Sequence, residues 1–274
     1  QERGLGGEFS NNLPAQTTSF IGRETEVAAV LKLFSRPDVR LVTLTGPGGS
    51  GKTRLSLRVA AKLLEQYADG VFFVSLAPLR SVDAIVPAVA GALGFSFYEG
   101  GEPGQQLLDY LREKNLLLIM DNFEHLLAGP EPGRGDGAGL VTDVLQTAPE
   151  VKILATSRAR LNVQGEHLFH LGGMDYPDWE TPEDALQYSA VKLFLQSARR
   201  VEPGFDLAAA DLKYIARICR LVGGMPLGIV LAAAWLTMLT LAEIAHQISG
   251  KIGASLDFLA TDLRDVPERQ HSMR

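Results

Sequence analysis

The feature that most constrains this chain is an eight-residue loop, Gly46-Pro-Gly-Gly-Ser-Gly-Lys52-Thr53, which fits the pattern G-x-x-x-x-G-K-[ST] without a mismatch. A short β-branched run at 40–45 precedes the loop and predicts a strand, and a helical pattern over 53–67 follows it. Glycines let such a loop curl with its backbone N–H groups pointing inward, where a Cβ would obstruct a phosphate. The loop therefore predicts a phosphate-binding turn at the N-terminus of a helix.

Apolar strands alternate with helical patterns through the first part of the chain. Continuous apolar strands of this kind are typical of a parallel sheet with helices on both faces. We expect strands at 40–45, 71–76, 116–120, 151–156 and 167–171, and helices at 24–34, 53–67, 82–93, 105–112 and 140–146. After about Gly173 the pattern changes to helical segments at 185–200, 208–221 and 227–238. The sequence thus predicts an α/β domain followed by a small all-helical domain.

Composition and charge narrow the class of protein. The chain has 274 residues, 46% of them hydrophobic, which is typical of a folded globular protein. Its 26 Lys+Arg against 32 Asp+Glu argue against direct nucleic-acid binding by this segment. The lone cysteine, Cys219, excludes a disulfide framework or a multi-cysteine zinc site and indicates a reducing compartment. Since we find neither a membrane-length apolar run nor a signal-peptide core, we expect a cytoplasmic protein without membrane partners.

A second element expected at a nucleotide site is an apolar strand that ends in an acid. The run at 116–120 is uninterrupted and is followed directly by Asp121. We expect Asp121 at the carboxyl end of this strand, facing the phosphate loop and holding Mg²⁺ through water. The Thr53 hydroxyl would then ligate Mg²⁺, while Lys52 would bridge the β- and γ-phosphates.

Hydrolysis also needs a group that orients or deprotonates the attacking water. Asn122 follows Asp121 directly, but an amide cannot accept a proton. Glu124 is the nearest carboxylate and is the predicted base, with His125 as an alternative.

An arginine follows the strand expected at 151–156. Arg158 comes after Thr156 and Ser157, where its guanidinium can reach a γ-phosphate and stabilise its charge. Arg160 is displaced by two positions. We therefore assign the phosphate-sensing role to Arg158.

Together these motifs resemble the STAND class of P-loop NTPases within the AAA+ group, and more narrowly an NB-ARC-type module of a bacterial regulator. The resemblance runs from about Asn11 to the C-terminus. The stretches that carry it, in the family's order, are NNLPAQTTSFIGRE, GPGGSGKTRL, LLLIMDNFEH, ILATSRARL and GGMPLGIVLAAAW.

The resemblance implies further binding residues and a division into domains. Ile21 and Arg23 match the segment that lines the adenine side of the pocket, and Pro226 matches a proline that packs against the base. The full set of implied nucleotide-binding residues is Ile21, Arg23, Gly46, Pro47, Gly48, Gly49, Ser50, Gly51, Lys52, Thr53, Arg54 and Pro226. The implied divisions are a linker at 1–18, a nucleotide-binding domain at 19–173, a helical domain at 174–262, and a lead-in at 263–274 to an absent winged-helix domain.

The resemblance implies a switch that binds ATP or ADP with Mg²⁺, hydrolyses ATP slowly and self-associates in the ATP state. Sensor and effector parts, controlling transcription or defence, would lie outside this segment. Many relatives carry a second acid where Asn122 stands, which leaves the hydrolytic base open and keeps a scaffold as an alternative. Two alternatives to the switch stay open in all. One is a scaffold that holds ADP without hydrolysis, and the other is a motor-type AAA+ ATPase with fast turnover.

Overall fold

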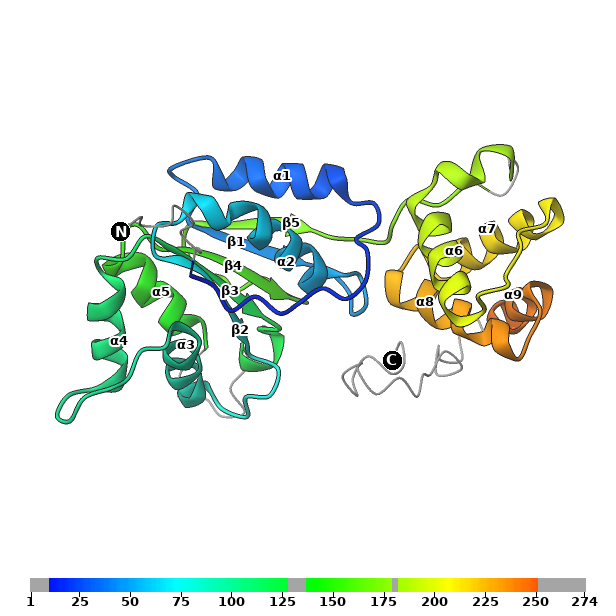
Figure 1. The fold of residues 1–274 in the computed structure, drawn as a ribbon. Helices are drawn as coiled ribbons and strands as arrows, with labels where there is room; N and C mark the ends of the chain where they lie inside the picture. The colour runs from blue at the N-terminus through cyan, green and yellow to red at the C-terminus, as the bar shows by residue number, and fades with distance from the viewer. Residues whose placement is uncertain (1–9, 128–136, 179–181, 251–274) are drawn as a thin grey trace, which may run out of the picture. The chain divides into compact units, whose positions relative to one another are not determined.

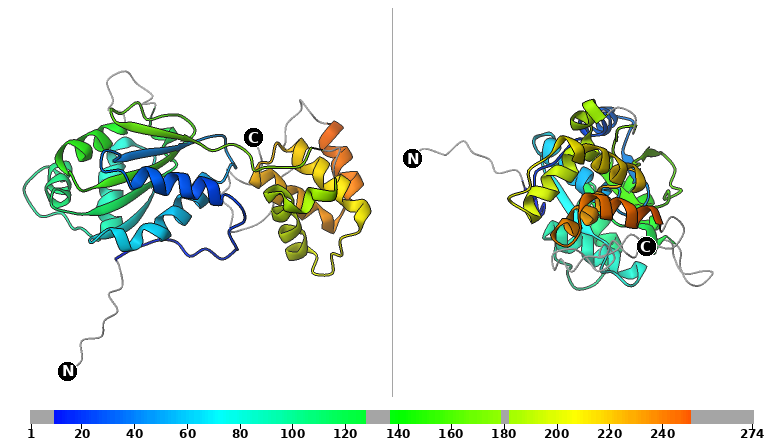
Figure 2. Two further views of the ribbon diagram at one scale, coloured as in Figure 1. Left: turned by 90° about the horizontal axis from the view of Figure 1, so that it is seen from above. Right: turned by 90° about the vertical axis from the view of Figure 1, so that its right-hand side faces the viewer.

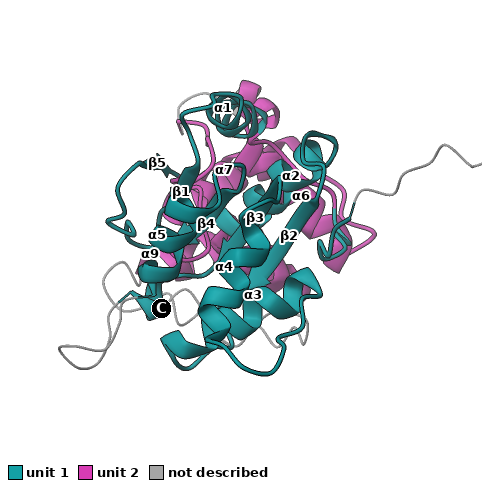
Figure 3. Ribbon diagram, turned by 90° about the vertical axis from the view of Figure 1, so that its left-hand side faces the viewer, with its two compact units in different colours: residues 1–18, 24–46, 52–170 teal, residues 19–23, 47–51, 171–274 magenta. Residues whose placement is uncertain are grey.

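The computed structural model describes residues 10–127, 137–178 and 182–250, so the predicted lead-in at 263–274 lies outside the described residues. The described residues form two compact units, which are coloured separately in Figure 3. Unit 1 comprises those within 1–18, 24–46 and 52–170, and unit 2 those within 19–23, 47–51 and 171–274.

The core of unit 1 is a five-stranded sheet in which every paired strand is parallel (Figure 1). The strand order is β2-β3-β4-β1-β5, so β4 lies between the strand that precedes the phosphate loop and the strand that ends in Asp121. The predicted parallel sheet is confirmed, and each strand lies within a residue of its predicted bounds. The strands are β1 (Leu41–Thr45), β2 (Gly70–Ser75), β3 (Leu116–Asp121), β4 (Lys152–Ser157) and β5 (Glu166–His170).

Helices cover both faces of this sheet, which explains the uninterrupted apolar character of β3. Successive strand residues point to opposite faces, so a strand buried on both must be apolar throughout. Leu118 and Met120 pack on one face, whereas Leu117 and Ile119 are fully buried outside that cluster. The first face is covered by α3 (Ile85–Leu93), α4 (Pro103–Leu111) and α5 (Ala138–Thr147), and the second by α1 (Glu24–Phe34) and α2 (Lys52–Leu63) (Figures 1 and 2).

Two of these helices are shorter than the apolar pattern predicted. The pattern over 53–67 continues as a 3₁₀ turn, Leu64–Gln66, after α2 ends, as tightened last turns commonly do. The pattern over 82–93 begins with another such turn, Val82–Ala84. Because α3 then starts at Ile85, Pro87 falls in its first turn, where the missing N–H costs no hydrogen bond.

Two cationic side chains hold the ends of helices in unit 1. The Arg40 guanidinium donates to the carbonyl oxygens of Leu145, Ala148 and Val151, at the end of α5 and in the turn that follows. Lys152 donates to the Phe34 oxygen at 2.8 Å, at the end of α1. The last carbonyls of a helix lack intrahelical partners and carry partial negative charge, so both cations satisfy them.

We expect Arg40→Met to lower the free energy of unfolding by about 1–3 kcal/mol, because several charge-assisted hydrogen bonds are lost together. Urea denaturation followed by far-UV circular dichroism measures this change. Arg36→Met is the matched control, since Arg36 only pairs with Asp38 on the surface at 2.6 Å. An Arg40 variant with the midpoint of the Arg36 control would show that water replaces the guanidinium at these carbonyls.

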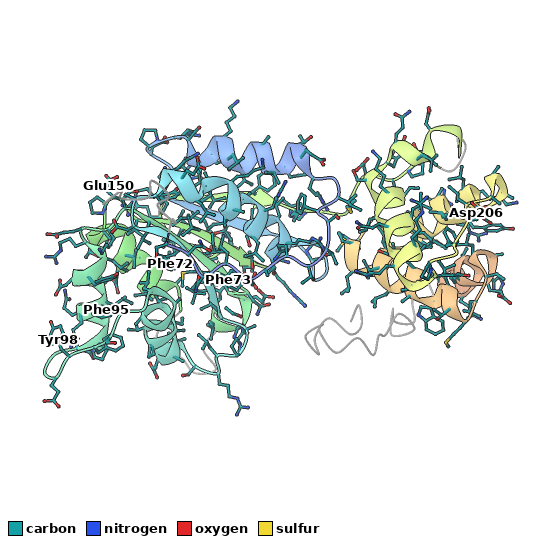
Figure 4. All side chains as sticks on the ribbon, in the orientation of Figure 1. Phe72, Phe73, Phe95, Tyr98, Glu150 and Asp206 are labelled. Atoms are coloured by element: carbon teal, nitrogen blue, oxygen red, sulfur yellow. The ribbon has the colours of Figure 1, made fainter. Side chains whose placement is uncertain are left out.

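The segment before α1 pairs with the free edge of β2. The Asn12 side chain accepts a hydrogen bond from the Phe73 N–H at 2.6 Å and donates to the Phe73 oxygen at 2.9 Å (Phe73 is labelled in Figure 4). The Val71 N–H donates to the Ser10 oxygen at 3.0 Å. A Cβ at Gly70 would meet that same oxygen, so this approach requires glycine. Residues 10–12 therefore cover a sheet edge that would otherwise present unpaired backbone groups.

Unit 2 is helical, and its helices share an apolar core that includes Phe194, Cys219 and Ile229, all fully buried. Its helices are α6 (Ser189–Val201), α7 (Leu212–Leu221), α8 (Pro226–Ala234) and α9 (Leu241–Gly250), with 3₁₀ turns at Pro182–Gln187, Ala209–Asp211 and Trp235–Thr237. The helical patterns predicted from 185 and 208 thus start with 3₁₀ turns. Within the described ranges, no helix combines the length and apolar character that crossing a bilayer requires.

The sequence prediction missed α9. Thr240 and Glu243 form a reciprocal cap at its start: the Glu243 carboxylate accepts from the Thr240 N–H at 2.9 Å, and the Thr240 hydroxyl accepts from the Glu243 N–H at 3.3 Å. This T-x-x-E spacing is a helix-start signal that is readable from sequence alone. The apolar residues Leu241, Ile244 and Ile248 then follow at helical spacing.

Candidate functional site

The phosphate loop joins β1 to α2 and has backbone angles that favour glycine. Gly49 and Gly51 have φ of +76° and +91°, in the region that L side chains rarely adopt. Ser50 between them is 1% exposed, and its Oγ has no hydrogen-bond partner among the described residues. A buried hydroxyl without a partner costs free energy, and a polar ligand that hydrogen-bonds to Ser50 Oγ would remove this cost.

Lys52, the first residue of α2, bends back toward Gly46, the first residue of the loop. Its Nζ donates to the Gly46 oxygen at 2.8 Å. Burial lowers the pKa of the Lys52 ammonium, and the nearby negative charge of Glu124 acts in the opposite direction. A partly desolvated cation at the start of α2 is suited to an anionic partner.

Asp121 is tied to the helix that follows the loop. It ends β3, is 4% exposed, and its Oδ1 accepts a hydrogen bond from the Thr53 hydroxyl at 2.7 Å. The structure therefore places the hydroxyl and the carboxylate predicted to hold Mg²⁺ in direct contact. The two residues are 68 positions apart in the sequence, and the fold of unit 1 brings them into contact.

The two oxygen ligands offered by Thr53 and Asp121 fit Mg²⁺ better than a metal ion that protein side chains coordinate on all sides. No group of three or more His, Cys, Asp or Glu suited to a metal ion occurs in the part of the chain that the structure describes. Mg²⁺ commonly keeps several waters and takes only one or two protein oxygens, with phosphate oxygens completing its shell. One hydroxyl beside one buried carboxylate is such a set.

The residues after Asp121 form a tight turn. Asn122 has φ of +68°, a left-handed conformation that asparagine tolerates better than most residues. The Asn122 amide nitrogen lies 3.2 Å from His125 Nδ1, and His125 Nε2 lies 3.1 Å from the Leu79 oxygen. Because a carbonyl only accepts, we assign the ring proton to Nε2, which leaves Nδ1 to accept from Asn122. Both ring nitrogens are engaged, which disfavours His125 as the base.

Glu124 and Arg158 lie next to each other. The predicted roles of the two residues, as base and as γ-phosphate contact, require such proximity. Arg158 Nε is 3.5 Å from Glu124 Oε1, and the side chains are 55% and 23% exposed respectively. Glu124 Oε2 is buried and accepts no hydrogen bond from any described residue. The pair thus offers a carboxylate oxygen and a half-exposed guanidinium to a ligand.

The remaining predicted site residues belong to two different units. In unit 1, Arg54 donates to the Thr18 oxygen at 2.7 Å. In unit 2, Arg23 donates to the Gly172 oxygen at 2.6 Å, and Ile21 packs against the helical core. These contacts show how each side chain is held within its own unit. The predicted roles of these residues in nucleotide binding stay predictions.

Pro226 is held beside the tip of the phosphate loop in unit 2. It is the first residue of α8, where proline fits because that N–H has no intrahelical partner. The next N–H, of Leu227, donates to the Gly49 oxygen at 3.2 Å. A Cβ on Gly51 would lie 3.8 Å from Pro226 Cγ.

Thr156 contacts the same acid, Asp121, although the sequence predicts no role for it. Its hydroxyl donates to Asp121 Oδ1 at 2.7 Å and accepts from the Asn122 N–H at 2.9 Å. A threonine near a strand end reads as an ordinary β-branched residue, so its spacing carries no signal. Only the strand order, which puts β4 beside β3, identifies its partners.

Comparison with protein families shows that residues 38–163 match the AAA domain family. Among solved structures, the chain resembles the Walker-type ATPase of Pyrococcus abyssi, at 13% identity and a TM-score of 0.53 over 84% of this chain and 71% of that one. It also resembles the Aeropyrum pernix ORC2 protein, at 17% identity and a TM-score of 0.51 over 83% and 67%. These likenesses show the fold, which is that of the P-loop NTPases.

Curated relatives are much longer than the match. A candidate HTH-type transcriptional regulator of Mycobacterium tuberculosis is 34% identical over 239 residues, which cover 86% of this chain and 24% of that protein. A second M. tuberculosis protein is 34% identical over 234 residues, covering 85% and 55%. The regulatory protein AfsR of Streptomyces griseus is 25% identical over 257 residues, covering 86% and 23%. The chain therefore spans between about a quarter and about half of these relatives.

Proposed function

We propose that this chain is the nucleotide-binding module of a larger cytoplasmic regulator, which binds ATP or ADP with Mg²⁺ and hydrolyses ATP slowly. The observation that carries the proposal is the hydrogen bond from Thr53, directly after the loop lysine, to the buried Asp121. It joins the end of the phosphate loop to the acid at the end of β3. An AAA domain match over residues 38–163 supports the same function.

Each group of the site has a defined part in this proposal. The loop N–H groups and Lys52 bind the phosphates, and Thr53 and Asp121 hold Mg²⁺, which when bound neutralises phosphate charge. Glu124 orients the attacking water and accepts its proton. Arg158 stabilises charge on the γ-phosphate. The ion pair between Glu124 and Arg158 supports this arrangement, because a γ-phosphate can compete for the guanidinium and leave the carboxylate to water.

Binding of the base is assigned to the residues that the family resemblance implies. Ile21 and Arg23 line the adenine side, and Pro226 packs against the base. We propose residues 19–173 as the nucleotide-binding domain and 174–262 as the helical domain. The contact between the start of α8 and the loop tip within unit 2 supports a proline near the nucleotide.

The output of such a module lies in other parts of its protein. One relative is named as a transcriptional regulator, which favours transcription control as this output. We also propose that the module self-associates in its ATP state. Light scattering of the chain with Mg·ADP and with a non-hydrolysable ATP analogue tests the second point. A mass that is the same in both states would contradict nucleotide-dependent assembly.

Glu124→Gln is expected to lower ATP hydrolysis by about 100-fold, because an amide cannot take the proton of water. ATP affinity should stay within about twofold, since Glu124 contacts water in this mechanism and not the phosphates. Phosphate release and nucleotide binding measure the two effects, with the exposed Glu113→Gln as the control.

Three results would contradict parts of this proposal. Unchanged hydrolysis in the Glu124 variant would remove that residue as the base. Wild-type turnover of several per second would favour a motor over a switch. Tight ADP binding without any hydrolysis would favour a scaffold, an outcome consistent with the amide at Asn122.

A further inference from the structure

Thr156 is the buried centre of the turn that carries the predicted magnesium-binding and water-orienting residues. It lies at the end of β4, is 1% exposed, and belongs to the strand between β1 and β3. Its hydroxyl donates to Asp121 Oδ1, and its backbone oxygen accepts from the Phe123 N–H at 2.9 Å.

The same hydroxyl oxygen accepts the Asn122 N–H at 2.9 Å. Three hydrogen bonds from one residue therefore span Asp121, Asn122 and Phe123. The left-handed φ of Asn122 turns the chain that follows it away from the strand direction. Glu124 follows directly, so its position depends on the same turn.

The bonds on Asp121 are asymmetric. Thr53 and Thr156 each donate to Oδ1 at 2.7 Å, whereas Oδ2 accepts no hydrogen bond from the residues that the structure describes. Two donors on one oxygen fix the rotation of a carboxylate about its last bond. Oδ2 is thereby left for a hydrated cation.

We infer that Thr156 is a positioning residue for magnesium. It holds the Asp121 carboxylate in one orientation, and so makes Mg²⁺ strengthen nucleotide binding without itself contributing to binding of the phosphates. This inference rests on the proposed function, because it assumes a nucleotide at the phosphate loop.

The test compares three variants of the full chain. Thr156→Val keeps the shape of the side chain but removes the donor to Asp121 and the acceptor for Asn122. Thr156→Ser keeps both. Thr43→Val makes the same exchange at a fully buried threonine on β1, whose hydroxyl has no partner among the described residues. Removing a hydroxyl of that kind should be neutral.

The readout is the ratio of ADP affinities with Mg²⁺ and with EDTA, which does not depend on hydrolysis. We expect Thr156→Val to reduce this ratio by at least about tenfold, as hydrogen bonds to charged groups are stronger than neutral ones. Affinity in EDTA should stay within about twofold. Thr156→Ser should restore most of the ratio, and Thr43→Val should leave it unchanged.

Two results overturn the inference without touching the proposed function. One is a wild-type ratio in Thr156→Val, and the other is an equal loss of ADP affinity with and without Mg²⁺, which would indicate general disruption. A wild-type chain that binds no ADP would instead contradict the proposed function itself.

Discussion

Replacing Lys52 by methionine is expected to weaken binding of both ADP and ATP by at least about 100-fold. The Lys52 ammonium is partly desolvated, and in the proposed site it would exchange its contact with the Gly46 oxygen for phosphate oxygens. Charge-assisted contacts of this kind are among the strongest in proteins, and a factor of 100 corresponds to about 2.7 kcal/mol. Anisotropy of a fluorescent ADP analogue measures the change.

Lys62→Met is the control for this variant. Lys62 lies in the same helix and is exposed, so its replacement removes the same charge from α2 away from the loop. ADP binding by Lys52→Met within about threefold of this control would contradict the assignment of the phosphate loop. Circular dichroism of both variants checks that α2 is intact.

Asp121→Asn is expected to abolish the effect of Mg²⁺ on nucleotide binding and to lower ATP hydrolysis by at least about 100-fold. The amide oxygen still accepts from the Thr53 and Thr156 hydroxyls, so the turn should keep its shape. What is lost is the negative charge that holds a hydrated divalent cation. Nucleotide affinity in EDTA should therefore change little.

The exposed Asp143→Asn on α5 is the matched control. Titration of Mg²⁺ against ADP-bound protein compares the two variants. The Asp121 variant should lose more of the Mg²⁺ effect than Thr156→Val, because the first removes the ligand and the second only its orientation. A Mg²⁺ response in Asp121→Asn equal to that of Asp143→Asn would show that the cation is held elsewhere.

The strands and the phosphate loop were predictable because their physical requirements appear locally in sequence. The strand β3 must be apolar at every position, since helices bury both of its faces, and Leu117 and Leu118 are accordingly almost fully buried. The loop needs glycines at Gly49 and Gly51, where φ is positive. Parallel strands follow from these patterns and from the helices between them.

The order of the strands was not predictable, and the missed part of the candidate site depends on it. Nothing in the apolar pattern places β4 between β1 and β3, yet that order puts Thr156 beside Asp121. The contacts of Arg40 and Asn12 are equally distant in sequence, 105 and 61 residues from Leu145 and Phe73. Such long-range polar contacts leave no periodic signal.

The helical unit shows a different kind of miss. The helix α9 has 10 residues and is no shorter than the predicted helix α8, which has 9, so its length does not explain the miss. The reciprocal cap formed by Thr240 and Glu243 was the readable signal.

We propose that Lys52, Thr53 and the acid of β3 belong to one nucleotide site. Calorimetric titration of the nucleotide-free chain with ADP, with and without Mg²⁺, tests it most directly. We predict saturable binding of about one ADP per chain that Mg²⁺ tightens through Asp121. The absence of saturable binding in both titrations would contradict a nucleotide site at these residues.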